Sequence, residues 1–297
     1  MSYKDILFPH LGLHFHEVGS YVSIGGFRIM YYGIVIASAF LLGMLIAARY
    51  AKSIGQDPEL VVDFVLAMVI PAILGARAYY VIFSWDHYKG NLGEIINLRH
   101  GGLGIVGGVA AAFLVLFIFC RIRHVKLPLM MDIMTMGLLA GQILGRWGNF
   151  FNREAFGGYT DNLLAMQIPL EYFQVNGRTG DLASGGIMEH IVQAGSGSDA
   201  MAAIQVHPTF LYEGLWNLAL LILIFIYRRH KKYDGELFSL YMMGYGAGRF
   251  MIESLRTDQL QIGSTGIAAT QVVCILLMAG GLIWELRGRR AAKKKSN

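Results

Sequence analysis

The chain has 297 residues, of which 55% are hydrophobic and 15% charged, and its mean hydropathy is +0.48. Soluble domains average about 25% charged residues, so this composition excludes an ordinary soluble enzyme. It also excludes a disordered chain, which needs low hydrophobicity. The net charge of +5 does not indicate nucleic-acid binding, because the basic residues separate apolar runs. Cys120 and Cys274 lie inside apolar runs, so we expect neither a disulfide framework nor a zinc site.

Seven apolar runs approach the length of about 20 residues that a bilayer-spanning helix needs. The third and the sixth are short and depend on neighbouring helices. We therefore expect an all-α integral membrane protein of about seven transmembrane helices. In chain order the runs are Met30–Tyr50, Leu60–Phe83, Leu103–Phe119, Leu129–Trp147, Phe210–Tyr227, Phe238–Ile252 and Gly266–Leu286.

The orientation of the helices follows from the positions of lysine and arginine. Most of the 25 basic residues fall at 49–52, 121–126, 228–232 and 287–295, which are alternate connections and the C-terminal tail. Basic connections remain in the cytoplasm, so the N-terminus is predicted to lie outside and the C-terminus inside. The expected parts are an extracytoplasmic N-terminal segment (1–29), a membrane domain (30–286), a small extracytoplasmic cap inserted into it (148–206) and a basic cytoplasmic tail (287–297).

A dense group of polar residues follows the fourth run, from Gly145 to Glu154. Arg146 offers a fork of donors that suits a phosphate. Asn149 and Asn152 add neutral donors and acceptors, and Glu154 could orient Arg146 or accept a proton. A lone arginine here would be read as a side chain reaching from the helix end to water. The density of polar groups instead favours a binding site.

A second group lies on the sixth run. Tyr245, Arg249, Glu253 and Arg256 are spaced so that they share one face if the helix continues. Charged residues inside a membrane are costly, about 2.5–3.5 kcal/mol each on insertion scales, and usually functional. The alternative is an Arg249–Glu253 pair that only ties two helices together.

The third group is the glycine-rich segment that precedes and begins the third run. Its five glycines disfavour a regular helix, and irregular backbone within a membrane survives only where protein or water satisfies it. We expect an unwound helix start whose N–H groups, at Gly107 and Gly108 among others, face an anion. His100 is a possible base, although a solvated loop histidine is equally plausible.

Three further residues lie at the outer ends of runs. Tyr32 opens the first run, where tyrosine is usually an interfacial residue. Arg77 lies in the outer half of the second run. His207 precedes the fifth run and is more often a helix-start residue than a catalyst. Together these groups predict a site for an anionic lipid headgroup, without a metal ion and without a cofactor.

Taken together, these motifs, in this order, resemble the prolipoprotein diacylglyceryl transferase family. The resemblance runs from about Ile24 to Leu286. It implies transfer of the diacylglyceryl group of phosphatidylglycerol to the lipobox cysteine of a preprolipoprotein, releasing glycerol phosphate. This is the first step of bacterial lipoprotein maturation. It further implies a multi-pass protein of the bacterial cytoplasmic (inner) membrane, with its site near the outer leaflet. Its partners would be phosphatidylglycerol and the signal peptides of preprolipoproteins, and not a nucleic acid.

The resemblance also assigns roles within the site. Arg146 and Arg249 should hold the lipid phosphate. We group these two with His100 and Glu154 as catalytic residues. The expected substrate-binding residues are Tyr32, Arg77, Gly107, Gly108, Asn149, Asn152, His207, Tyr245, Glu253 and Arg256.

The chain departs from the family at two histidine positions. Relatives often carry a histidine, the proposed base, before the second pair of glycines, where this chain has Val106, and another where it has Met30. Either His100 takes over this role or histidine base catalysis is not essential, and we favour the second interpretation. The alternative function is a transporter or flippase for an anionic lipid or another anion. It would require polar residues along a path across the membrane, whereas here they gather at the outer level.

Overall fold

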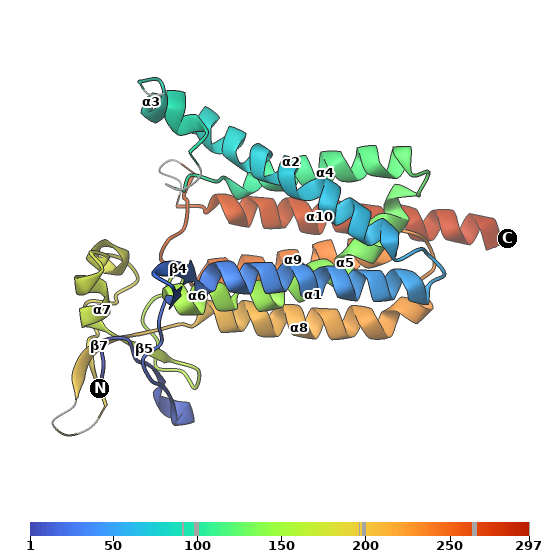
Figure 1. Cartoon of the computed structure of the whole chain (residues 1–297). Helices are drawn as coiled ribbons and strands as arrows, with labels where there is room; N and C mark the ends of the chain where they lie inside the picture. Colours follow the sequence, from blue (N-terminus) through green and yellow to red (C-terminus); the bar gives the residue numbers. More distant parts are fainter. Residues whose placement is uncertain (91, 98–100, 196, 198–199, 263–265, 297) are drawn as a thin grey trace. The chain divides into compact units, whose positions relative to one another are not determined.

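The computed structural model describes residues 1–90, 92–97, 101–195, 197, 200–262 and 266–296 (Figure 1). The chain divides into two compact units, Met44–Gly137 and the combination of Met1–Gly43 with Leu138–Asn297. The long helices are α1 (Tyr31–Ser53), α2 (Glu59–Phe83), α4 (Ile105–Ile122), α5 (Leu127–Gly145), α8 (Thr209–Tyr227), α9 (Glu236–Glu253) and α10 (Ala269–Ser296).

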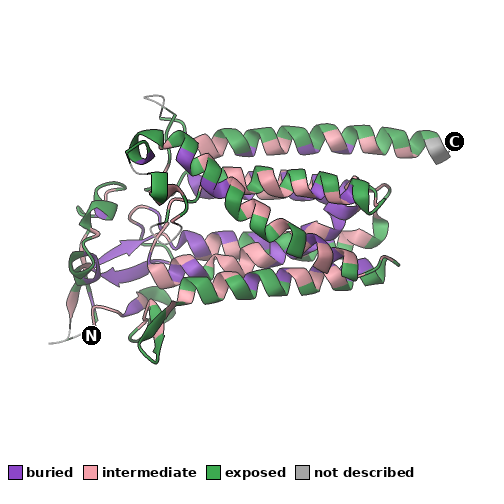
Figure 2. Cartoon of the chain, turned by 45° about the horizontal axis from the view of Figure 1, so that its top comes forward, coloured by how far each residue is buried: buried purple, intermediate pink, exposed green. Residues whose placement is uncertain are grey.

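Six helical stretches in the described residues are long and apolar enough to cross a membrane, and they indicate a multi-pass membrane protein. They correspond to every predicted run except the sixth. That run does form a helix, α9, but its 18 residues include Glu236, Arg249 and Glu253, so its composition is not that of an ordinary span. Many leucine, isoleucine and phenylalanine side chains on the other long helices are exposed, as expected of surfaces that face lipid (Figure 2).

The expectation of an all-α protein is wrong in one respect, because the larger unit contains two small sheets. A five-stranded antiparallel sheet has the strand order β2-β1-β5-β7-β6, and a separate hairpin pairs β3 with β4. The strands are too short, at three to six residues, to show a clear alternating pattern. Their bounds are β1 Ile6–Phe8, β2 Leu13–Phe15, β3 Tyr21–Ile24, β4 Phe27–Met30, β5 Met166–Pro169, β6 Val192–Ala194 and β7 Met201–Val206.

The five-stranded sheet joins two parts that the sequence analysis kept separate. Strands β1 and β2 come from the N-terminal segment, and β5 to β7 come from the predicted cap; Leu7 pairs with Gln167 across the junction. A buried core covers the sheet and includes Phe150 of α6 (Trp147–Asn152), Phe173 of α7 (Leu170–Val175) and Phe210 of α8. This core fixes α6 and the start of α8, and these elements carry several of the polar residues of the predicted site.

Within the smaller unit, α2 and α4 pack through glycine. A Cβ atom at Gly107 would lie only 2.2 Å from the carbonyl oxygen of Gly75, so the two backbones touch. Close approach through small residues is typical of helices that associate in membranes. Helix α2 continues through Pro71. The short helix α3 (Trp85–Tyr88) follows α2.

Candidate functional site: an arginine–carboxylate cluster

The carboxylate of Glu213 in α8 lies between two arginines from different helices. Its Oε1 is 2.5 Å from Nη2 of Arg146, which lies at the junction of α5 and α6. Its Oε2 accepts a hydrogen bond of 3.0 Å from Nη1 of Arg249 in α9. The Glu213 side chain is 3% exposed, so the pairing takes place away from water. Two residues that the sequence analysis assigned to one phosphate site are thus brought together by a third.

The pairing continues along α9. Nη2 of Arg249 lies 2.5 Å from Oε2 of Glu253, one helical turn later. Arg256 lies beyond the end of α9, with its Nε 4.0 Å from Glu253, and it also binds Asp258 through two hydrogen bonds of 2.9 and 2.7 Å. We call the five residues Arg146, Glu213, Arg249, Glu253 and Arg256 the arginine–carboxylate cluster.

The cluster retains capacity to bind an anion. Within the described part of the chain, Glu213 is the acidic side chain that forms an ion pair with Arg146, and Arg146 is 24% exposed. A guanidinium has five N–H donors in a fixed fork, so donors of Arg146 remain for a ligand. Arg249 is 10% exposed and divides its two terminal nitrogens between Glu213 and Glu253. Of the two arginines predicted to hold the phosphate, Arg146 is therefore the more accessible and Arg249 the more rigidly held.

Glu213 was not among the residues predicted for the site. The sequence did contain a signal, since this acidic residue lies in the first half of an apolar run, where charge is rarely tolerated without a function. Glu154 does not pair with Arg146 as the sequence suggested. Its Oε1 instead accepts a hydrogen bond of 2.9 Å from Nδ2 of Asn149. The expected partner of Arg146 is thus replaced by one from a different helix.

Two tyrosines lie beside the cluster. The ring of Tyr32 packs on Gly148, where a Cβ atom would lie 2.7 Å from the ring, and its hydroxyl interacts electrostatically with Glu154 and Arg146. Tyr245 stacks on Tyr241 with ring centroids 5.4 Å apart, and it interacts electrostatically with Glu213 and both arginines. The structure therefore brings the predicted residues Tyr32, Tyr245, Asn149 and Glu154 together with Arg146 and Arg249.

His207 and Arg256 line one hollow at the end of α9, together with Ser184, Thr257 and Gln259. The ring Nδ1 of His207 is 3.1 Å from the hydroxyl of Tyr212. Burial lowers the pKa of His207, so the neutral ring is favoured. Asn152 ends α6, and its carbonyl accepts a hydrogen bond of 2.7 Å from Arg178. The roles predicted for His207 and Asn152 in substrate binding stay predictions.

Arg77 belongs to the smaller unit, where it holds a loop. Its guanidinium donates five hydrogen bonds of 2.6–3.0 Å to backbone carbonyls, and the side chain is buried. All five N–H groups of an arginine are thereby used. This geometry favours a structural role over the predicted contact with substrate. The carbonyls belong to Glu94, Ile95, Asn97, Gly101 and Gly102.

The prediction of exposed N–H groups at the second pair of glycines is wrong. The N–H groups of Gly107 and Gly108 both donate to the carbonyl of Gly104 in the first turn of α4, at 3.1 and 3.3 Å. Gly107 serves helix packing, because a Cβ atom there would collide with α2, and a Cβ atom at Gly108 would fit only tightly, 3.3 Å from the carbonyl oxygen of Ala72. The irregular backbone lies earlier, at Gly101 and Gly102, which both have φ of +79°. His100 lies outside the described residues.

Comparisons with known proteins agree with these motifs. Residues 20–286 match the family model described as prolipoprotein diacylglyceryl transferase. Three similar proteins are named phosphatidylglycerol–prolipoprotein diacylglyceryl transferase. One from Finegoldia magna is 37% identical over 90% of this chain and 94% of its own length. One from Bacillus cereus is 38% identical over 91% of each chain. One from Clostridioides difficile is 35% identical over 88% of this chain and 91% of its own.

Proposed function

This chain belongs to the prolipoprotein diacylglyceryl transferase family, and we infer that it moves the diacylglyceryl group of phosphatidylglycerol onto the cysteine thiol of a prolipoprotein. The observation that carries the site assignment is the pairing of Arg146 and Arg249 through Glu213. It places two guanidinium groups from different helices at one point, where a lipid phosphate can be held from two sides. Bidentate donors of this kind suit phosphate oxygens.

The reaction forms one bond and breaks one. The cysteine sulfur attacks the glyceryl carbon that carries the phosphate, and a C–S thioether forms. The C–O bond to that carbon breaks, and its electron pair leaves with the oxygen as glycerol phosphate. The thiol proton passes to solvent or to a base of the enzyme. Atoms and charge balance without a metal ion or a redox partner.

The arginines contribute most to catalysis by stabilising the negative charge that develops on the leaving phosphate. The leaving phosphate gains negative charge as the C–O bond breaks, and donors already aimed at it stabilise that transition state. A free thiol has a pKa of about 8.5, and neighbouring cationic groups increase the thiolate fraction. Arg146 and Arg249 would therefore assist both the nucleophile and the leaving group. Glu213 acts as a positioning residue, because it holds the two guanidinium groups at one place.

We further propose that the protein lies in the cytoplasmic membrane with its site at the outer leaflet. The basic connections support this orientation, and α9 would form a seventh, polar span sheltered by its neighbours. The signal peptide of the prolipoprotein would lie alongside in the membrane and present its cysteine. The residues of the cap and of the N-terminal segment, which share one sheet, would face the exported part of the substrate.

A transporter for an anionic lipid is the competing function, and the names of the similar proteins do not favour it. One experiment separates the two. Purified protein is given phosphatidylglycerol with a labelled diacylglyceryl group and a peptide that contains a lipobox cysteine. We expect the label on the peptide cysteine through a thioether, and none on a peptide with serine in its place. Absence of labelled peptide from folded protein would contradict the proposed function.

A further inference from the structure

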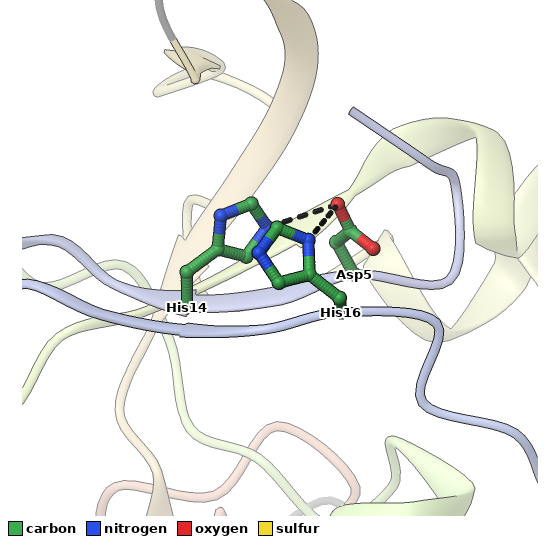
Figure 3. A group of neighbouring side chains, drawn as sticks. All are labelled: Asp5, His14 and His16. Carbon is green, nitrogen blue, oxygen red and sulfur yellow. Dashed lines mark hydrogen bonds and ion pairs between the residues drawn. The ribbon is translucent and has the colours of Figure 1, made fainter.

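The N-terminal hairpin brings three metal-ligating side chains to one face. In the pairing of β1 with β2, Leu7 lies opposite His14, and the same register continued places Asp5 opposite His16. Side chains two residues apart on a strand point to the same face, so Asp5, His14 and His16 converge (Figure 3). We call these three residues the histidine–aspartate cluster. It belongs to the edge of the five-stranded sheet and shares no residue with the arginine–carboxylate cluster.

The ligand atoms of this cluster are close to one another. Oδ2 of Asp5 is 2.9 Å from Nε2 of His14 and 3.8 Å from Nδ1 of His16, and the three atoms lie within 4.8 Å of one another. Around a tetrahedral zinc ion with bonds of about 2.0 Å, neighbouring ligand atoms are about 3.3 Å apart. The observed Asp5–His14 distance is shorter than this ideal spacing, and the Asp5–His16 distance is longer. The His16 side chain is 70% exposed and has room to make the small adjustment required.

The carboxylate of the cluster is fixed before any ion binds. The Asp5 side chain is 2% exposed. Its Oδ1 accepts a hydrogen bond of 2.9 Å from the backbone N–H of Glu17, and its Oδ2 accepts one of 3.1 Å from the N–H of Ser2. Such outer contacts orient the ligands of metal sites and strengthen binding. Asp5, His14 and His16 line one hollow that is open to solvent. The site therefore combines one rigid carboxylate with two histidines that a metal ion can reach from water.

We propose that Asp5, His14 and His16 bind a divalent transition metal ion of the zinc class. Two imidazoles and one carboxylate suit Zn²⁺, Ni²⁺ or Cu²⁺, whereas Mg²⁺ and Ca²⁺ prefer oxygen ligands alone. Three protein ligands leave a coordination position for water. Bound metal ties the edge strand β2 to the residue that precedes β1, and so stabilises the edge of the sheet. The site is independent of the transfer reaction.

The proposal is tested by zinc binding to the full chain in detergent, purified through a tag that contains no histidine. Isothermal titration with Zn²⁺ is compared among wild type, His14→Ala, His16→Ala and His87→Ala. His87 is an exposed histidine on α3 and serves as the matched control. We expect one site in wild type and in the control. Mutation of a residue that only supports a metal ligand already lowers metal affinity about 10–100-fold. Loss of either histidine ligand should therefore weaken zinc binding at least tenfold.

Two further measurements make the outcome decisive. Excess Mg²⁺ should not displace the zinc, and zinc should raise the thermal unfolding midpoint of wild type but not of His16→Ala. His16 is mostly exposed, so its loss should leave the midpoint without metal unchanged. The proposal is overturned if wild type binds no zinc or if both histidine variants bind it as wild type does. The cluster would then be an ion pair between Asp5 and protonated histidine only.

Discussion

Oε2 of Glu213 accepts a hydrogen bond of 3.0 Å from Nη1 of Arg249, and this contact joins α8 to α9 at a point buried from water. The remaining oxygen of the same carboxylate lies against Arg146. Two arginines side by side repel each other, and the shared carboxylate offsets that repulsion. The position of the proposed phosphate site therefore depends on a residue that we do not expect to touch the reacting atoms.

Replacing Glu213 with glutamine should reduce activity. The amide has one acceptor oxygen, so it cannot serve both arginines, and its NH₂ group faces one of them. A hydrogen bond to a charged group contributes about 1.5–3 kcal/mol, which corresponds to about a 10–100-fold loss of kcat/KM. Initial rates of transfer at varied phosphatidylglycerol concentrations measure it. Glu171→Gln, an exposed change in α7, is the control. Unchanged kcat and KM in Glu213→Gln would refute the positioning role.

Arg249→Lys should lose at least about tenfold in activity although the charge remains. The two terminal nitrogens of Arg249 contact Glu213 and Glu253 separately, and a lysine ammonium cannot reproduce that fork. Arg146→Ala should abolish nearly all transfer, since it removes the more accessible of the two arginines proposed to bind the lipid phosphate. Arg121→Lys, an exposed change in α4, controls for the substitution itself. Well-folded variants at both sites with full activity would show that the phosphate binds elsewhere.

His100→Ala tests whether this histidine is a base. If thiolate forms mainly through the field of the arginines, the loss of rate should be less than about tenfold, whereas general base catalysis contributes about 10²–10⁴-fold. Rates at about pH 6.5 and about pH 8.5, on both sides of neutrality, should rise with pH in both proteins as the thiol ionises. His87→Ala is the control. A hundredfold loss with phosphatidylglycerol binding retained would identify His100 as the base.

Arg153→Leu should destabilise the junction between the N-terminal segment and the cap. Arg153 is 1% exposed, donates to the carbonyls of Lys4 and Val18 at 2.5 and 2.7 Å, and lies 4.2 Å from the ring centroid of Tyr172. Each buried acceptor left without a donor costs about 1–3 kcal/mol. The thermal unfolding midpoint should fall clearly below that of Arg28→Leu, which changes an exposed arginine. Equal midpoints would show that the buried contacts add little.

Reporter fusions test the proposed orientation. Gly195 lies in the predicted cap, and Lys232 lies in the basic connection between α8 and α9. A reporter active only outside the cytoplasm should give signal at Gly195, and a cytoplasmic reporter should give signal at Lys232, because basic connections are retained inside. The same location for both fusions would refute the proposed path of the chain.

Apolar length and charge at the boundaries were sufficient to predict most of the helices. Helices α1, α2 and α8 begin and end within three residues of the predicted runs, because a bilayer-spanning helix satisfies its backbone within itself and needs no information from elsewhere in the chain. The five-stranded sheet could not be found in this way. Its strands pair residues far apart in sequence, such as Leu7 with Gln167, and each is too short to carry a pattern alone.

The sequence by itself identified the kinds of residue in the site, because charged groups inside apolar runs are conspicuous. Arg249 and Glu253 were predicted for this reason, and Arg146 was predicted from the dense polar group around it. Only the tertiary structure decided which charges meet, since contacts between helices depend on how each helix is rotated and how deep each side chain lies. It paired Arg146 with Glu213 rather than Glu154, and it bound Arg77 to backbone carbonyls. Residue type is a local property, whereas the partner of a buried charge is set by packing.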